Sequence, residues 1–292
     1  MDGSRITTHI KPLIGAKTVG GLRRSDVETM QYDIASGKTA KPRVGGRGGT
    51  AAGGNGVAAR TISTLHSIFE HALRLEVIET NPARGVRKLS TTPRERRLST
   101  SEIMALGGAM KMLASEGEHA TGLAAIRLLI LTGFRRLEGL ALQRDWFDPN
   151  ASCVRFPDTK SGAQTRAIGE AACDLINSRL AVGSSPYVFP ADWGSGHFIG
   201  IIRVLDRVCA RAGLEAVTPH VLRHTFGSIA GDLGFSELII AAMLGHAPRG
   251  VTQRYVHIEE PIKIAANRVS SEIAKLLDHA GVVGRAKDPS SN

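Results

Sequence analysis

The sequence has 292 residues, of which 42% are hydrophobic, and its formal net charge is +10. A chain of this length can form two domains with separate cores, and it has no apolar run near the roughly eighteen residues of a membrane-spanning helix. Met1 is followed by charged residues rather than by the apolar stretch of a secretion signal, so we expect a cytoplasmic protein.

The three cysteines are odd in number and widely spaced, at Cys153, Cys173 and Cys209. No Cys-x-x-Cys pair is present, which argues against a disulfide framework and against a zinc site. We expect the three thiols to be buried, and we predict neither a metal nor another cofactor.

The positive charge is concentrated in the N-terminal third of the chain. Residues 1–100 hold 17 Lys and Arg against 8 Asp and Glu, whereas residues 101–292 hold 20 against 19. Such an imbalance favours a polyanionic partner that contacts residues 1–100. A basic surface that serves only solubility would give the same count, so charge alone leaves both interpretations open.

Two helices are predicted in residues 1–92. The first spans residues 25–35 with Ser25 as its N-cap. The second spans residues 58–78, with an apolar stripe that includes Ile62, Leu65, Phe69 and Val77, and it is stopped by Asn81-Pro82. Between them, residues 37–56 are rich in glycine and in Lys and Arg, and we expect them to form a mobile basic loop.

A polar, basic linker near Pro93 is predicted to separate residues 1–92 from a second domain at 93–283, followed by a disordered tail at 284–292. In the second domain, Ser99 and Glu102 form a capping box, and helical periodicity then extends to Phe147. Extended runs around residues 146–147, 153–156 and 165–168 predict a small antiparallel sheet, after which helices continue to about Ala280. The expected fold is mainly α with a small antiparallel β-sheet (α+β).

Six side chains suited to phosphoryl transfer lie in the second domain: Arg135, Lys160, His220, Arg223, His246 and Tyr255. A phosphodiester under attack gathers charge on its non-bridging oxygens, which planar guanidinium groups bind well. A tyrosine can act as nucleophile if cations and a base assist its ionisation.

The sequence around these residues suggests their roles. Thr218 as N-cap and Pro219 in the first turn predict a helix that places His220 and Arg223 on one face. We take His220 as the proton acceptor of the tyrosine. Lys160, in the predicted turn DTKSG, is the candidate general acid, and His246, after a helix capped by Ser236, is a candidate phosphate donor.

The segments TGFRRLE, HVLRHTF and LGHAPRGVTQRY together resemble the tyrosine recombinase (phage integrase) family over most of residues 95–275. The resemblance implies that Arg135 and Arg223 are the two catalytic arginines and Tyr255 the nucleophile. Lys160 is then the β-hairpin lysine, His220 the histidine of the His-x-x-Arg box and His246 the His/Trp position. Glu138 matches an acidic position that supports the basic residues.

By this resemblance we expect a site-specific DNA recombinase or integrase of a mobile element, which cleaves and rejoins strands through a 3′-phosphotyrosyl intermediate without metal or ATP. Its partner is double-stranded DNA, bound as a homo-tetramer on paired sites, with an accessory DNA-bending protein as a further candidate partner. Residues 1–92 are short for the family's helical core-binding domain, so we expect an abbreviated domain. The candidates for DNA contact are Lys38, Lys41, Arg43, Arg47 and Arg60.

His220 and His224 have zinc-ligand spacing, but Val221 stands where a zinc protease has glutamate, and Arg223 would repel a cation. A metal-dependent transposase needs clustered carboxylates, which the sequence lacks. A truncated, non-recombining DNA-binding protein of the same fold remains an open alternative. The apolar segment after Tyr255 also allows two interpretations, since it can pack on its own domain or dock on a neighbouring subunit.

Overall fold

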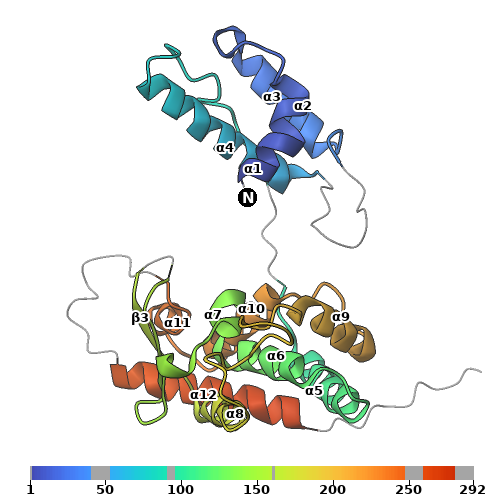
Figure 1. The fold of residues 1–292 in the computed structure, drawn as a ribbon, viewed down its shortest axis with the longest axis vertical. Coiled ribbons are helices and arrows are strands. Elements are labelled where there is room, and N and C mark those ends of the chain that lie inside the picture. The colour runs from blue at the N-terminus through green and yellow to red at the C-terminus, as the bar shows by residue number, and fades with distance from the viewer. Residues whose placement is uncertain (1, 41–52, 91–95, 160–161, 247–258, 280–292) are drawn as a thin grey trace, which may run out of the picture. The chain divides into compact units, whose positions relative to one another are not determined.

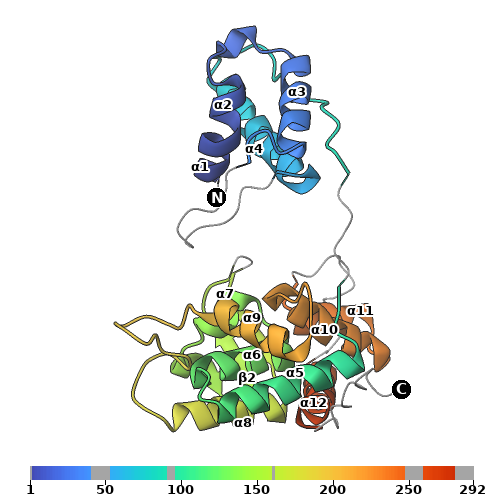
Figure 2. The same ribbon diagram turned by 90° about the vertical axis from the view of Figure 1, so that its right-hand side faces the viewer.

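The computed structural model describes residues 2–40, 53–90, 96–159, 162–246 and 259–279. The chain divides into two compact units, Met1–Arg94 and Glu95–Asn292, which Figures 1 and 2 show in two views. Within the described ranges, no helix combines the length and the apolar character needed to cross a bilayer. The expected tail at 284–292 lies outside these ranges.

The first unit is helical where it is described. Its elements are α1 (Asp2–Arg5), η1 (Ile6–Ile10), α2 (Lys11–Ile14), η2 (Val19–Gly21), α3 (Arg24–Ala35) and α4 (Asn55–Arg74). Apolar side chains at helical spacing on α3 and α4 pack together into one core, whose buried members include Val27, Ile34, Ile62 and Leu65. This core is separate from that of the second unit.

Two predicted boundaries in this unit are wrong. Helix α3 is capped by Arg23 rather than by Ser25, because the Asp26 carboxylate accepts a hydrogen bond from the Arg23 N–H at 2.9 Å. Helix α4 begins at Asn55, inside the predicted loop 37–56, and has Leu75 as its C-cap.

The early end of α4 has a local cause. Glu76 adopts a positive φ of 56°, and Val77, predicted on the buried stripe, is 65% exposed. Asn81 does not stop the helix but folds back on it, since its side-chain amide donates to the His66 carbonyl at 3.2 Å. The helix therefore ends through its own C-cap turn, several residues before Pro82.

The second unit is a helical domain with one small sheet. Its elements are α5 (Thr100–Ser115), α6 (Ala120–Thr132), α7 (Arg136–Leu140), η3 (Arg144–Trp146), β1 (Phe147–Asp148), β2 (Cys153–Phe156), β3 (Gln164–Ala167), α8 (Glu170–Leu180), α9 (Ile201–Ala212), α10 (Pro219–Asp232), α11 (Glu237–Met243) and α12 (Glu259–Asp278). The strands are antiparallel in the order β1-β2-β3, with Val154 opposite both Phe147 and Arg166. The prediction of a mainly helical fold with a small antiparallel sheet is confirmed.

Helix α6 lies at the centre of this unit. Leu128, Leu129, Ile130 and Leu131 are all buried, as expected for a helix that is apolar on every side. Helices α5, α8, α9, α10 and α12 pack against it. All three cysteines are buried, as predicted. This central helix ends directly at the candidate site described below.

Helix α12 packs on its own unit, against α5, α6 and α8, as Figure 1 shows. The contact with α5 is close: a Cβ added to Gly107 would lie 2.0 Å from the Leu277 carbonyl oxygen. Ala265, Val269 and Ile273 fill the core from the same helix. Ordinary packing thus accounts for the apolar spacing of this segment.

The capping box of α5 is confirmed and gives a pH prediction. Glu102 accepts hydrogen bonds from Arg96 (2.9 and 2.5 Å) and from the Ser99 N–H (2.8 Å). The hydrogen bonds from Arg96 outweigh burial and lower the pKa of Glu102 from 4.5 to about 2. A lowered carboxyl pKa stabilises the fold above the unfolded pKa, and this contribution is lost as the pH falls from 4.5 toward 2.

We expect Glu102→Gln to lower the free energy of unfolding by about 1–2 kcal/mol at pH 7, because the side chain is partly exposed and the ion pair is partly screened. At pH 2 the variant and the wild type should differ little. Urea unfolding at both pH values measures this, and an equal loss at pH 7 and pH 2 would contradict it.

Candidate active site

The first part of the site lies where α6 ends and α7 begins. Gly133 has a positive φ of 63°, which turns the chain sharply after Thr132. Arg135 is the N-cap residue of α7, and its backbone N–H donates to Glu138 Oε2 at 2.9 Å. Its guanidinium Nη1 donates to Glu138 Oε1 at 2.6 Å, while its side chain stays 40% exposed. The cation is thus held at one edge and open to solvent.

The Glu138 carboxylate accepts hydrogen bonds from two arginines. Its Oε1 also accepts from Arg166 Nη2 at 3.2 Å. Burial by itself would raise the pKa of Glu138, but the charge of Arg166 and the hydrogen bonds from Arg135 outweigh it and leave the pKa below its usual value. The carboxylate is therefore ionised at neutral pH and holds both cations.

Arg223, on α10, is 7% exposed and is fixed by two backbone carbonyls. Its Nη1 donates to the Gly133 carbonyl at 2.8 Å, and its Nη2 donates to the Leu244 carbonyl at 2.7 Å. Burial first, and then the charges of Arg135 and Arg166, lower the pKa of Arg223 to about 10, so it is still a cation at neutral pH. These bonds join the ends of α6 and α11 to α10.

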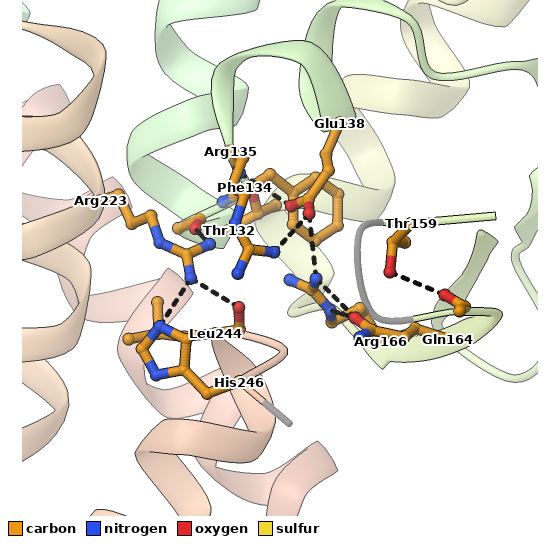
Figure 3. A network of polar contacts seen from close by, with 12 residues as sticks. Thr132, Phe134, Arg135, Glu138, Thr159, Gln164, Arg166, Arg223, Leu244 and His246 are labelled. Atoms are coloured by element: carbon orange, nitrogen blue, oxygen red, sulfur yellow. Dashed lines mark hydrogen bonds and ion pairs between the residues drawn. The ribbon is translucent and has the colours of Figure 1, made fainter. Parts of the chain in front are cut away.

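The two predicted histidines line the same pocket as Arg223. His246 Nε2 lies 3.1 Å from Arg223 Nη2, as Figure 3 shows. Since an arginine only donates, this contact requires His246 Nε2 to accept, with the ring proton on Nδ1. His220 Nε2 lies 2.9 Å from His224 Nε2. Burial, followed by the charges of His224 and Arg223, lowers the pKa of His220, which favours the neutral ring at pH 7.

These side chains surround one pocket of about 330 Å³, lined by Arg135, Arg136, Pro219, His220, Arg223 and His246. The lining residues supplied by the described part of the chain carry guanidinium and imidazole groups and no carboxylate. The pocket also lies at the N-terminus of α10, where Thr218 caps the helix and Pro219 is its first residue, as predicted. Its chemistry suits an anion with several oxygens, such as a phosphodiester.

The two remaining predicted residues are not placed. Lys160 and Tyr255 lie outside the described residues. Thr159 and Gly162, which flank the lysine segment, exchange two backbone hydrogen bonds of 3.0 and 2.9 Å. The structure thus brings together Arg135, His220, Arg223 and His246, and leaves the placement of the lysine and the tyrosine as predictions.

The phage integrase family model matches residues 96–261, which is more than half of the chain. The chain belongs to the phage integrase family. Tyrosine recombinase XerD of Rhizobium meliloti (strain 1021) is 28% identical over 225 residues, which cover 69% of this chain and 70% of that protein. XerD of Brucella suis biovar 1 (strain 1330) is 42% identical over 163 residues, which cover 50% and 52%.

Solved structures show the same fold. A lambda integrase (75–356) dimer bound to a COC′ core site matches with a TM-score of 0.62 at 16% identity, over 85% of this chain and 86% of that one. The Tn1549 transposon integrase in complex with a circular intermediate DNA matches with a TM-score of 0.62 at 14% identity, over 84% of each chain. The family consists of enzymes that break and rejoin DNA strands, so the assignment of this chain as a tyrosine-type DNA strand transferase is confirmed.

The predicted DNA contacts of this family member lie in its first unit. Lys38 pairs with Asp33 at 2.8 Å and is 62% exposed. Arg60 lies on the exposed face of α4 and lines a shallow pocket of about 540 Å³ together with Arg5, Ser63, Thr64, Ser67 and His71. Three further candidates lie outside the described residues: Lys41, Arg43 and Arg47.

Sequence reasoning missed two groups at the site. Arg166 is 1% exposed and joins the network around Glu138, but the run Gln164-Thr165-Arg166 is polar throughout and gave no sign of which side chain faces inward. His224 was considered only as a zinc ligand, whereas it contacts His220 directly. The spacing of four residues between His220 and His224 places the two rings on one face of the helix, and it indicated their mutual contact rather than a zinc ion.

Proposed function

We propose that this chain is a site-specific DNA recombinase of a mobile element, which cleaves and rejoins strands through a 3′-phosphotyrosyl bond to Tyr255 without metal or ATP. The observation that carries the proposal is the pocket in which Arg135, Arg223, His220 and His246 meet. Four side chains from three separate segments form one cationic pocket with the chemistry of a phosphate site.

The two arginines bind the non-bridging oxygens of the scissile phosphate. Charge on these oxygens grows as the fifth ligand approaches, so a fixed cation stabilises the transition state more than the ground state. Arg223 is oriented before DNA arrives, by the carbonyls of Gly133 and Leu244, and needs no rearrangement. Arg135 is more exposed and is oriented by Glu138.

His220 and Lys160 transfer the protons in this proposal. The phenol of a tyrosine has a pKa near 10, so only about a thousandth is ionised at pH 7. His220, neutral at that pH, accepts the phenolic proton. Lys160 protonates the leaving 5′ oxygen. His246 turns from Arg223 to a phosphate oxygen when DNA binds, which requires its contact with Arg223 to open.

The freed 5′ hydroxyl of a second duplex then attacks the phosphotyrosyl bond and restores the tyrosine. Because bond energy is conserved, the exchange requires neither a nucleotide nor a metal. The proposal includes a homo-tetramer on paired sites, and it is supported by the fold shared with a lambda integrase tetramer bound to a Holliday junction. Binding of this chain to paired DNA sites, measured with and without an added DNA-bending protein, tests both the tetramer and the accessory partner.

The proposal is tested with a nicked suicide substrate, on which a cleaved strand loses the fragment needed for religation. We expect a protein–DNA adduct that resists denaturation, with the DNA attached to Tyr255 in the tryptic map. Specific binding without an adduct would favour the non-recombining DNA-binding protein instead.

The basic residues at 41–47 give an electrostatic prediction. Replacing Lys41, Arg43 and Arg47 together by glutamine should weaken DNA binding and lower the slope of log K against log salt by about 2–3, since each phosphate contact releases close to one counterion. The rate of cleavage of bound DNA should not change. A charge-matched control replaces three exposed cations of the second unit, Arg203, Arg211 and Lys275. Equal slopes for both triple variants would show that net charge alone is responsible.

A further inference from the structure

Arg166 is a buried cation for which the proposed chemistry has no direct use. It lies on β3 with a side chain only 1% exposed. Its Nε and Nη2 donate to Gln164 Oε1 at 3.1 and 2.8 Å, and Nη2 also donates to Glu138 Oε1 at 3.2 Å. Figure 3 shows its guanidinium and that of Arg135 both directed at the Glu138 carboxylate. Burying a guanidinium is costly, and the cost is offset only where the group is paired and hydrogen-bonded.

The guanidinium of Arg166 is enclosed on its remaining sides. The rings of Phe134 and Phe156 lie 5.9 and 5.6 Å from Cζ. The backbone of Gly245 lies directly against it, since a Cβ added there would be 1.9 Å from Cζ. Gly245 has a positive φ of 62° and immediately precedes His246. Arg166 therefore touches the turn that carries this histidine.

Two separate segments of the pocket thus depend on one side chain. Arg135 is oriented by Glu138, whose Oε1 is shared with Arg166. His246 follows the turn that rests on the Arg166 guanidinium. We propose that Arg166 is a positioning residue, which fixes Arg135 through Glu138 and fixes His246 through Gly245. The inference rests on the proposed function in one respect only, that these two residues bind the scissile phosphate.

The charge of Arg166 matters as well as its shape. Its Nη1 is buried without a hydrogen-bond partner in the described part of the chain, so its charge is only partly compensated. The charged groups around it are Glu138, Arg135 and Arg223, and its field already contributes to the lowered pKa of Arg223. An apolar side chain of the same volume would fill the space. Among the described residues, Glu138 would then be paired with Arg135 alone.

The test compares Arg166→Met, which keeps the volume, with Arg166→Lys, which keeps the charge. The matched control is Arg155→Met on the adjacent strand β2, where the arginine is 62% exposed and pairs with Asp148. In single-turnover cleavage of the suicide substrate, we expect Arg166→Met to be about 10–100-fold slower, the usual size of effects on groups that orient active residues. DNA affinity should change less than about threefold, and Arg155→Met should match the wild type.

The pKa of Glu138 separates positioning from a general loss of structure. Without Arg166, the buried Glu138 loses a cation that lowers its pKa, so it should protonate at higher pH. The pKa of Glu138, measured from the pH dependence of its side-chain carboxyl carbon resonance, should rise by about one unit in Arg166→Met, and Arg166→Lys should restore it. A Glu138 pKa unchanged in Arg166→Met would overturn the proposal.

A measurement without DNA keeps this inference distinct from the proposed function. The Arg135 N–H is bonded to Glu138 Oε2 and the His246 N–H to the Ala241 carbonyl. In Arg166→Met these two amides should exchange with solvent faster, by about fivefold or more, while amides of α5 and α9 keep their rates. Uniformly faster exchange, or none, would overturn the proposal. A wild type that forms no adduct, with the exchange pattern as expected, would refute the function and leave the coupling intact.

Discussion

Tyr255→Phe is expected to abolish the covalent protein–DNA adduct and to leave DNA affinity within about twofold of the wild type. The substitution removes one hydroxyl and keeps the ring, so packing and the cationic pocket are preserved. Because the phenolic oxygen is the proposed nucleophile, strand cleavage should fall by at least about 10⁴-fold, as when the nucleophile of other covalent enzymes is removed.

The adduct is measured by denaturing gel after incubation with the suicide substrate. Tyr187→Phe is the control, since Tyr187 lies in the second unit with its ring 5.8 Å from that of His197, far in sequence from the proposed nucleophile. An adduct that persists in Tyr255→Phe would show that another residue attacks the phosphate.

Arg135→Ala is expected to slow cleavage by about 10³-fold or more and to weaken DNA binding only a few-fold. A single arginine that stabilises a phosphoryl-transfer transition state contributes about this much. Binding is spread over many phosphates, so the loss of one contact matters little to affinity. Arg155→Ala is the control, because the Arg155 side chain is 62% exposed and pairs with Asp148 outside the pocket.

Arg223→Ala should show the same loss of cleavage together with a loss of stability. Its removal leaves the buried carbonyls of Gly133 and Leu244 unpaired, at a cost of about 2–4 kcal/mol in the free energy of unfolding. Arg135, at 40% exposure, carries no such role. We therefore assign a catalytic role to Arg135 and both a catalytic and a structural role to Arg223. Equal thermal shifts for the two variants would contradict this assignment.

The sequence predicted the elements that have strong local signals. Ser99 with Glu102, Thr218 with Pro219 and Ser236 all mark helix starts that the structure contains. The start of α3 and the end of α4 were predicted less well, because Asp26 and Glu76 act through a backbone hydrogen bond and a positive φ that composition does not reveal. A helix boundary marked by a strong side-chain cap is therefore predictable from the sequence, whereas a boundary set by backbone geometry is not.

For the site, the sequence predicted which residues carry chemistry but not how they are held. His220 and Arg223 lie one turn apart on a helix, so their meeting in one pocket follows from the helical repeat. The role of Arg166 depends on Glu138, 28 residues earlier, and on Gly245, 79 residues later. Contacts over such separations depend on the tertiary fold, so no local pattern could have shown them.

The central claim is that Arg135 and Arg223 act on the charge of the scissile phosphate, and a neutral phosphate tests it most directly. Single-turnover cleavage is measured for the wild type and Arg135→Ala on two suicide substrates, one with the normal scissile phosphate and one with a methylphosphonate there, which lacks one charged oxygen. We predict that the roughly 10³-fold defect of Arg135→Ala on the phosphate shrinks to about tenfold or less on the methylphosphonate. The same defect on both substrates would contradict the account.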